Sequence, residues 1–352
     1  SFDPVDADFF FGRERLVAEM VARLTGAPLL GIVGPSGSGK SSALRAGLLA
    51  ALADGVLPGS EDWALALLRP GENPLGALEQ AIGEAAPRDR LIVAVDQFEE
   101  AFATCRDESE RRAFVDALLS RARDSRRRTL VLVAVRADFY GRCAAYPELS
   151  RLLGTNQVLV GPMRRGELRR AIELPARRAG LRVEPELVDA LVADVEGEPG
   201  ALPLLSTSLL ELWQRRDGRR LRMRAYDHVG GVHGAVARLA ESAYERLDPD
   251  RRRLARRILL RLAGEGEGDT VVRRRVPVAE LNSWRDPRVD EVLAVLAQER
   301  LVAIGEGEVE VAHEALLREW PRLRGWLEED AEGRRLQLHL GAAAREWDVG
   351  GR

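Results

Sequence analysis

Short apolar runs alternate with longer amphipathic stretches over the first 160 residues of the chain. Four runs, at 29–33, 91–96, 130–135 and 156–160, have the length and apolar character of buried parallel strands. The stretches between them, notably 109–123, have helical spacing. This alternation predicts an α/β fold, a parallel sheet with helices on both faces. Such sheets bind ligands at the carboxyl ends of their strands.

After residue 162 the pattern becomes helical, with apolar positions spaced three or four apart through 168–195 and 205–213. From residue 248 it predicts three helices and then a hairpin with strands at 301–304 and 308–311, an order typical of a winged helix. We therefore expect a first α/β domain over 1–163, a helical domain over 164–247 and a winged-helix domain over 248–330. A C-terminal helix is expected over 331–352.

The segment from Gly34 to Ser41 fits the phosphate-binding pattern G-x-x-x-x-G-K-[ST], between a predicted strand and a predicted helix. Its glycines allow successive backbone N–H groups to surround phosphate oxygens, and the helix adds its positive end. Lys40 is expected to reach the β- and γ-phosphates, and Ser41 to bind Mg²⁺. The predicted nucleotide contacts here are Gly34, Pro35, Ser36, Gly37, Ser38, Gly39, Lys40, Ser41 and Ser42. A P-loop NTPase domain over 1–163 follows from this motif.

Lys40 is the only lysine among the 53 basic residues of the chain. The guanine-reading N-K-x-D motif and the strand lysine of protein kinases both need a lysine outside the phosphate loop, so both classes are disfavoured. Adenine is the better prediction for the base, with ATP or ADP and Mg²⁺ as the cofactors.

Charged residues stand at the ends of two predicted strands beside the phosphate loop. Asp96 ends one strand and is expected to hold Mg²⁺ together with Ser41. Glu99 or Glu100 could orient the attacking water, and their spacing does not choose between them. Arg136 ends the next strand and is predicted to sense the γ-phosphate. These four residues and Lys40 form the predicted catalytic set of an ATPase.

The composition of the chain disfavours several classes of partner and site. The net charge of −3 disfavours a generally nucleic-acid-binding surface, and two cysteines are too few for a disulfide framework or a zinc site. No apolar run approaches the length of a membrane span, so we expect a cytoplasmic protein without membrane contact. The chain begins at a serine, which we interpret as a fragment of a longer protein.

Seven segments, in this order, together resemble the STAND class of signalling NTPases, close to the bacterial novel STAND group and related to NACHT and NB-ARC switches. They lie at 11–14, 34–41, 96–100, 136–140, 201–205, 230–232 and 313–321. The resemblance implies an NTPase domain, a helical domain and a winged-helix domain. It also implies bacterial signal transduction, including defence.

The resemblance adds three distant contacts to the nucleotide site. Gly12 and Arg13 correspond to a segment near the adenine, and Pro203 to a proline that packs on the base. His313 corresponds to a histidine that contacts the ADP phosphate, although spacing alone favours a core histidine or a helix cap. The next residue is Glu314, where better-known relatives carry Asp.

Members of the class are switches that are closed with ADP and open and self-associate with ATP. The resemblance implies the same for this chain, with slow hydrolysis and with fused effector and repeat-sensor domains outside it. The alternative is a DNA-binding ATPase of the origin-recognition type, with arginine runs at 251–253, 256–257 and 273–275. Helix 289–298 holds two acids and no basic residue, which makes nucleic-acid binding the weaker hypothesis.

Overall fold

The computed structural model describes residues 2–24, 27–105, 107–123, 128–197, 201–265, 271–282, 286–299, 301–305, 307–312 and 315–329. The chain divides into two compact units, Ser1–Tyr226 and Asp227–Arg352. Among the described residues, no helix combines the length and the apolar character that crossing a bilayer would require.

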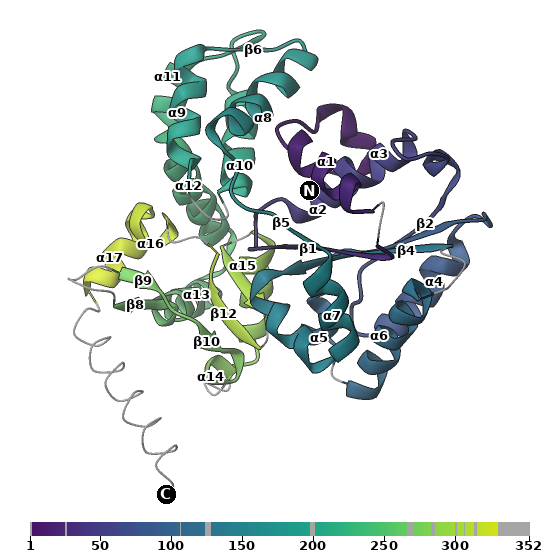
Figure 1. Ribbon diagram of the computed structural model, residues 1–352. Coiled ribbons are helices and arrows are strands. Elements are labelled where there is room, and N and C mark those ends of the chain that lie inside the picture. Colours follow the sequence, from purple (N-terminus) through teal and green to yellow (C-terminus); the bar gives the residue numbers. More distant parts are fainter. Residues whose placement is uncertain are drawn as a thin grey trace, which may run out of the picture. The chain divides into compact units, whose positions relative to one another are not determined.

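A five-stranded parallel sheet forms the centre of the first unit, in the order β2-β3-β4-β1-β5 (Figure 1). Its strands are β1 (Leu29–Gly34), β2 (Ala64–Leu68), β3 (Leu91–Val95), β4 (Thr129–Arg136) and β5 (Gln157–Leu159). The predicted parallel α/β fold and its four predicted strands are confirmed. Strand β4 lies between β1 and β3, so the carboxyl ends of these three parallel strands are neighbours.

Strand β2 was not predicted from the sequence. Its residues are alanines and leucines, which favour helices when no packing partner is considered. The strand pairs with β3 at the edge of the sheet, and Leu65 is 39% exposed there. Pairing with β3, rather than local propensity, therefore sets its conformation.

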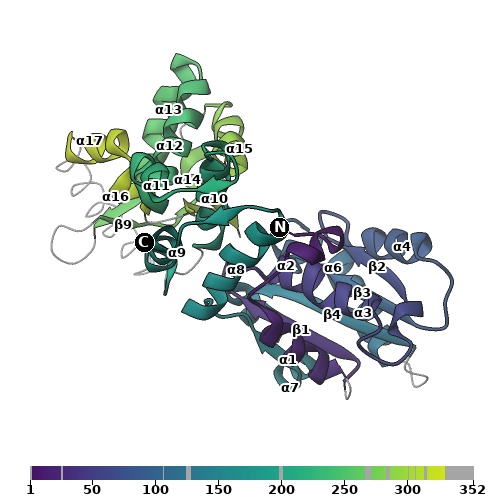
Figure 2. The same ribbon diagram turned by 90° about the horizontal axis from the view of Figure 1, so that it is seen from above.

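Helices cover both faces of the sheet because alternate strand side chains point to opposite sides. Leu30 and Ile32 of β1 share a core with helices on one face, whereas Leu29 and Val33 belong to the core of the other face. The first face carries α1 (Glu14–Leu24), α2 (Lys40–Ser42), a π-helix (Ala43–Leu49) and α3 (Ala50–Ala53) (Figures 1 and 2). The second carries α4 (Pro74–Glu84), α5 (Glu100–Ala103), α6 (Glu108–Ala122) and α7 (Pro147–Thr155).

Four helices follow the sheet in the chain. They are α8 (Arg165–Arg178), α9 (Pro185–Val195), α10 (Leu202–Gln214) and α11 (Met223–Val229). The short strands β6 (Arg182–Val183) and β7 (Arg220–Leu221) pair in parallel between them. Pro203 lies in the first turn of α10, where a proline suits the fixed backbone angle of a helix start.

The second unit combines helices with short antiparallel sheets. Its helices are α12 (Gly231–Arg246), α13 (Pro249–Arg261), α14 (Val278–Asn282), α15 (Val289–Gln298), α16 (Ala315–Glu319) and α17 (Pro321–Glu329). The predicted hairpin is present as β11 (Val302–Gly305) and β12 (Glu308–Val311), and β10 (Val276–Pro277) joins β12. The pair β8 (Ala263–Glu265) and β9 (Val271–Arg273) was not predicted. The helix expected over 331–352 falls outside the described residues.

Candidate nucleotide-binding site

The phosphate loop leaves β1 at Gly34 and enters α2 at Lys40. Gly37 and Gly39 adopt φ angles of 72° and 89°, in the left-handed region that glycine occupies without a steric penalty. Within the described part of the chain, the buried Ser38 hydroxyl has no hydrogen-bond partner. A curled backbone with an unsatisfied hydroxyl beside a helix start suits an anionic ligand.

Gly34 is held closely by its neighbours at the edge of the sheet. A Cβ atom at this position would lie 2.7 Å from the Val160 carbonyl oxygen and 3.0 Å from the Ser38 hydroxyl. Gly34 also pairs with Arg136 in the register of β1 and β4. The loop therefore starts at a fixed point beside the ends of two strands.

The Lys40 side chain folds back across the loop. Its Nζ atom donates to the carbonyl oxygens of Gly34 (2.8 Å) and Pro35 (2.9 Å), and only 9% of the residue is exposed. Burial lowers the pKa of Lys40, and the Glu99 carboxylate opposes that effect. Because the ordinary lysine value lies far above neutral pH, the side chain remains a cation suited to a phosphate.

Ser41 and Asp96 come together as the sequence predicted. The Ser41 hydroxyl donates to Asp96 Oδ1 over 2.7 Å, and Asp96 is fully buried. Its second oxygen, Oδ2, accepts from Arg45 Nε at 3.0 Å and lies 2.9 Å from Arg45 Nη2. The guanidinium thus compensates a carboxylate that would otherwise be costly to bury.

The pair offers a hydroxyl oxygen and a carboxylate oxygen, the hard donors that Mg²⁺ prefers. Among the described residues, no group of three or more His, Cys, Asp or Glu side chains is placed to hold a metal. A metal at Ser41 and Asp96 would therefore complete its shell with water and nucleotide phosphates, which is the usual situation for Mg²⁺. The residues present fit that ion.

Glu99 and Glu100 point to different partners. Glu99 accepts a hydrogen bond from the Arg136 backbone N–H (3.2 Å), and burial raises its pKa, against the influence of Lys40. Glu100 accepts from the Gly71 N–H (3.2 Å), in the loop that follows β2. Of the two, Glu99 faces the phosphate loop.

The turn that carries these glutamates is strained. Gln97 has a φ of 56°, the single positive φ among the described non-glycine residues. Such a conformation persists where the surroundings hold it, and the Phe98 N–H bonds to the Ala134 carbonyl (2.9 Å) directly after it. The turn sets the direction of Glu99 relative to Asp96.

Arg136 lies where predicted, at the carboxyl end of β4, but an acid holds it. Its Nε and Nη2 atoms bind both oxygens of Asp138 at 3.1 and 2.6 Å, and its guanidinium carbon lies 5.3 Å from the Phe139 ring centroid. The side chain is 18% exposed, so it borders the site. Sequence reasoning missed Asp138, although it lies only two residues away.

Arg13 binds the phosphate loop itself. Its Nη2 atom donates to the carbonyls of Ser38 (3.0 Å) and Gly161 (2.8 Å), and the residue is 7% exposed. Burial lowers the pKa of Arg13. Gly12 is equally constrained, because a Cβ there would lie 2.4 Å from the Glu167 carbonyl oxygen. The structure thus shows this segment supporting the loop, and its contact with a base remains a prediction.

Pro203 is half-buried at the start of α10. Its neighbour Leu202 comes within 3.4 Å of the position that a Cβ on Gly39 would occupy. The start of α10 is therefore beside the phosphate loop, as a base-packing role would require. His313 and Glu314 fall outside the described residues.

Arg45 was also missed by sequence reasoning. It follows Ser41 by four residues, a spacing that places two side chains on one face of a helix. This spacing could have indicated that Arg45 lies near Ser41 and its partner Asp96. The chain has so many arginines that the spacing alone did not distinguish this one.

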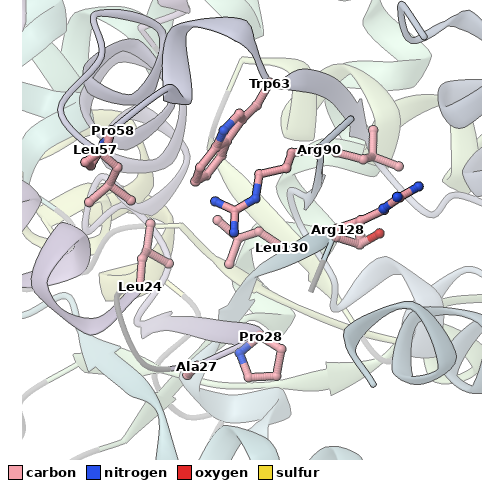
Figure 3. A pocket seen from close by; sticks show the side chains of 11 residues that line it. Leu24, Ala27, Pro28, Leu57, Pro58, Trp63, Arg90, Arg128 and Leu130 are labelled. Carbon is pink, nitrogen blue, oxygen red and sulfur yellow. The ribbon is translucent and has the colours of Figure 1, made fainter. Parts of the chain in front are cut away.

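A separate pocket of about 340 Å³ lies at the amino ends of the strands, whereas the phosphate loop lies at their carboxyl ends. Figure 3 shows Leu24, Leu57, Trp63 and Leu130 around it, with the Arg90 guanidinium 4.8 Å from the Trp63 ring centroid. It is lined by residues at the starts of β1, β3 and β4, so it is distinct from the nucleotide site.

The family described as "Novel STAND NTPase 1" matches residues 1–352. The chain belongs to this family. It is therefore an NTPase of the P-loop ATPase class, and the novel STAND resemblance predicted from its motifs is confirmed.

A search of the curated proteins found no match. Among solved structures, this novel STAND NTPase is similar to the ORC1 protein of Aeropyrum pernix, solved in complex with DNA. The TM-score is 0.50 and the identity 17%, over 94% of this chain and 95% of that one. A Walker-type ATPase of Pyrococcus abyssi matches with a TM-score of 0.44 and 17% identity, over 88% and 96% of the two chains. At this identity the likeness to ORC1 shows a shared fold.

Proposed function

We propose that this novel STAND NTPase is a conformational switch that is closed with ADP and opens and self-associates with ATP. The observation that carries the nucleotide-binding part of the proposal is the hydrogen bond from Ser41 to Asp96, which joins the phosphate loop to the buried residue after β3, and the two states are proposed from the family resemblance. A regulatory NTPase needs a site whose parts bind the nucleotide tightly and hydrolyse it slowly. The fully buried Asp96 and the nearly buried Lys40 support tight binding.

Each site residue has a proposed role. Lys40 neutralises the β- and γ-phosphates, and Ser41 with Asp96 holds Mg²⁺. Glu99 orients the attacking water, a choice supported by its place beside Arg136 and by the separate bond of Glu100 to Gly71. Arg136 exchanges its Asp138 partner for the γ-phosphate, which makes it a sensor of ATP.

The three-domain organisation also remains part of the proposal: an NTPase domain over 1–163, a helical domain over 164–247 and a winged helix over 248–330, followed by the segment 331–352. From α13 onward the element order is α13, β8, β9, β10, α14, α15, β11 and β12, and its three helices followed by a hairpin support a winged helix. The approach of α10 to Gly39 supports a base contact by Pro203. Effector and sensor domains fused outside this chain would receive and supply the signal.

Closure is proposed to depend on His313, as the corresponding histidine implies. A near-complete swing between two states needs about 5.5 kcal/mol of differential ligand affinity. A phosphate contact made only in the closed state supplies part of that difference, and loss of the contact favours the open state.

His313→Ala is therefore expected to speed the release of ADP about tenfold, the effect of losing roughly 1.4 kcal/mol of binding free energy. Release is measured by chasing a fluorescent ADP analogue with unlabelled ADP. His228→Ala is the matched control, because His228 is exposed on α11. If His313→Ala releases ADP and self-associates at wild-type levels, His313 does not hold the closed state.

The DNA-binding alternative has less support from the second unit. Many of its arginines are already paired with acids, as in Arg251 with Glu291, Arg253 with Asp250, Arg256 with Glu329, and Arg275 with Glu310. Helix α15, the expected recognition helix, carries Asp290 and Glu291 in its first turn. Duplex binding at sub-micromolar affinity with a steep salt dependence would favour the alternative over the switch.

A further inference from the structure

The N-terminal segment, residues 2–10, lies against the helix that follows the phosphate loop. It contains the 3-10 helix η1 (Pro4–Phe9). The Phe2 backbone N–H donates to the Ser42 hydroxyl over 3.1 Å, and the Phe2 and Phe10 ring centroids lie 5.8 Å apart. Phe10 also comes within 3.1 Å of the position of a Cβ on Gly47. The segment therefore touches the phosphate-loop helix at both of its ends.

Arg45 connects this segment to the proposed metal site. Its Nε and Nη2 atoms lie 3.0 and 2.9 Å from Asp96 Oδ2, and its Nη1 atom donates to Asp3 Oδ1 over 2.8 Å. The Arg45 side chain is 15% exposed, that of Asp96 1%, and that of Asp3 51%. One guanidinium thus spans from a buried carboxylate to a carboxylate at the surface.

The three charges respond to a metal in a defined way. Asp96 has one negative charge, and both Arg45 and a Mg²⁺ ion would be attracted to it. The two cations repel each other, so a metal at Asp96 favours a guanidinium displaced toward Asp3. Conversely, a negative charge at Asp3 attracts Arg45 and reduces its competition with the metal. The mutual effect is required by linkage, because coupling between two binding events is reciprocal.

We propose that Arg45 is a positioning residue that couples Mg²⁺ binding at Asp96 to docking of the N-terminal segment through Asp3. The inference rests on the proposed metal site at Ser41 and Asp96. Mg²⁺ strengthens the Arg45–Asp3 contact, and a docked segment strengthens Mg²⁺ binding. Binding of Mg²⁺ at Asp96 thereby strengthens the docking of the residues that precede α1.

The test is the Mg²⁺ affinity of the ADP complex, measured by calorimetric titration of Mg²⁺ into ADP-saturated protein. Asp3→Asn leaves Arg45 fully engaged with Asp96 and is expected to weaken Mg²⁺ binding about fivefold, the lower end of typical coupling between linked sites. Arg45→Gln removes the competing cation and is expected to strengthen binding. In the Arg45→Gln background, Asp3→Asn should have no further effect.

Asp8→Asn is the matched control, because Asp8 belongs to the same segment but pairs with Arg178 (2.7 Å) instead of Arg45. Its Mg²⁺ affinity should equal that of the wild type. Amide exchange of residues 2–10 is a second readout: adding Mg²⁺ should slow it in the wild type and leave it unchanged in Arg45→Gln.

The outcomes separate the inference from the site on which it rests. If the wild-type ADP complex binds no Mg²⁺, the metal site itself is wrong. If Mg²⁺ binds with equal affinity to the wild type and Asp3→Asn, the site stands and the coupling is overturned. Asp3 is half-exposed, so this variant keeps the test available even if Arg45→Gln fails to fold.

Discussion

Lys40 and Glu99 both lose solvent beside the phosphate loop, and burial shifts their pKa values in opposite directions. Lys40 loses solvent but keeps two carbonyl partners, so it remains a cation at neutral pH. Glu99 loses solvent next to Lys40, and burial raises its pKa. A carboxylate with a raised pKa is a better proton acceptor, which suits a group that orients the attacking water.

We expect Glu99→Gln to lower ATP turnover about 100-fold, the usual contribution of a positioned general base. Glu100→Gln is the matched control and should retain near-wild-type turnover, because Glu100 bonds to Gly71. A phosphate-release assay at saturating ATP measures both. The assignment fails if Glu100→Gln proves the slower variant.

Glu99→Gln is also expected to change the thermal stability of the protein in a pH-dependent way. Because the folded-state pKa of Glu99 is raised, its stabilising contribution is complete below the unfolded-state pKa and is lost as the pH rises through the folded-state value. Glu99→Gln is therefore expected to raise Tm relative to the wild type at pH 7.5, with a smaller gain near pH 4. Calorimetry at both values measures the difference, and a gain that is larger at pH 4 would contradict the proposed burial effect.

The sequence identified the backbone of this site better than its network of side chains. The phosphate loop and the strand-end residues Asp96 and Arg136 were predicted because motifs and strand ends are local features. The partners Arg45 and Asp138 were not, because an arginine's partner depends on which carboxylate the fold places within reach. The different directions of Glu99 and Glu100 likewise depend on the turn at Gln97, which their spacing does not reveal.

At the scale of elements, the second unit is organised around an aromatic cluster. Trp320, between α16 and α17, is 1% exposed, and its ring centroid lies 5.9 Å from Tyr244 and 5.6 Å from Trp326. Its Nε1 atom donates to Glu241 of α12 over 2.7 Å. Arg322 binds the same carboxylate and lowers the pKa of Glu241. These contacts fix α16 and α17 on α12.

Trp320→Ala is expected to lower the free energy of unfolding of the second unit by about 4 kcal/mol, as for other buried tryptophans. Ile304→Ala should change it by no more than about 0.5 kcal/mol, because Ile304 belongs to the same unit and is 44% exposed on β11. Urea denaturation followed by circular dichroism measures both. Equal midpoints for the two variants would show that the cluster does not stabilise the unit.

Whether a strand was predicted depended mainly on whether its residues are of a type that favours strands. The four strands of the sheet that contain valine or isoleucine were found, and Ala64–Leu68 was missed because alanine and leucine also suit a helix. The hairpin at β11 and β12 was found because a glycine turn separates two β-type runs. The pair β8 and β9 was missed although Gly266, Gly268 and Asp269 stand between its strands, because Ala263–Glu265 contains no β-branched or aromatic residue.

At the scale of the whole molecule, this member of the novel STAND NTPase family has a phosphate loop in its first unit and helices with small sheets in its second unit. The order of segments along the sequence was sufficient to predict the family. The proposed switch could not be derived from local features, because it concerns the relative stability of two states of the chain.

The most direct test of the proposed switch is the molar mass of the protein in solution, measured by size-exclusion chromatography with light scattering, with Mg-ADP and with Mg-ATP. We predict the mass of one chain with ADP and a multiple of it with ATP. Lys40→Ala, which loses the proposed phosphate contact, should remain a single chain in both. A wild-type mass that is identical with the two nucleotides, while ATP binding is verified, would contradict the account.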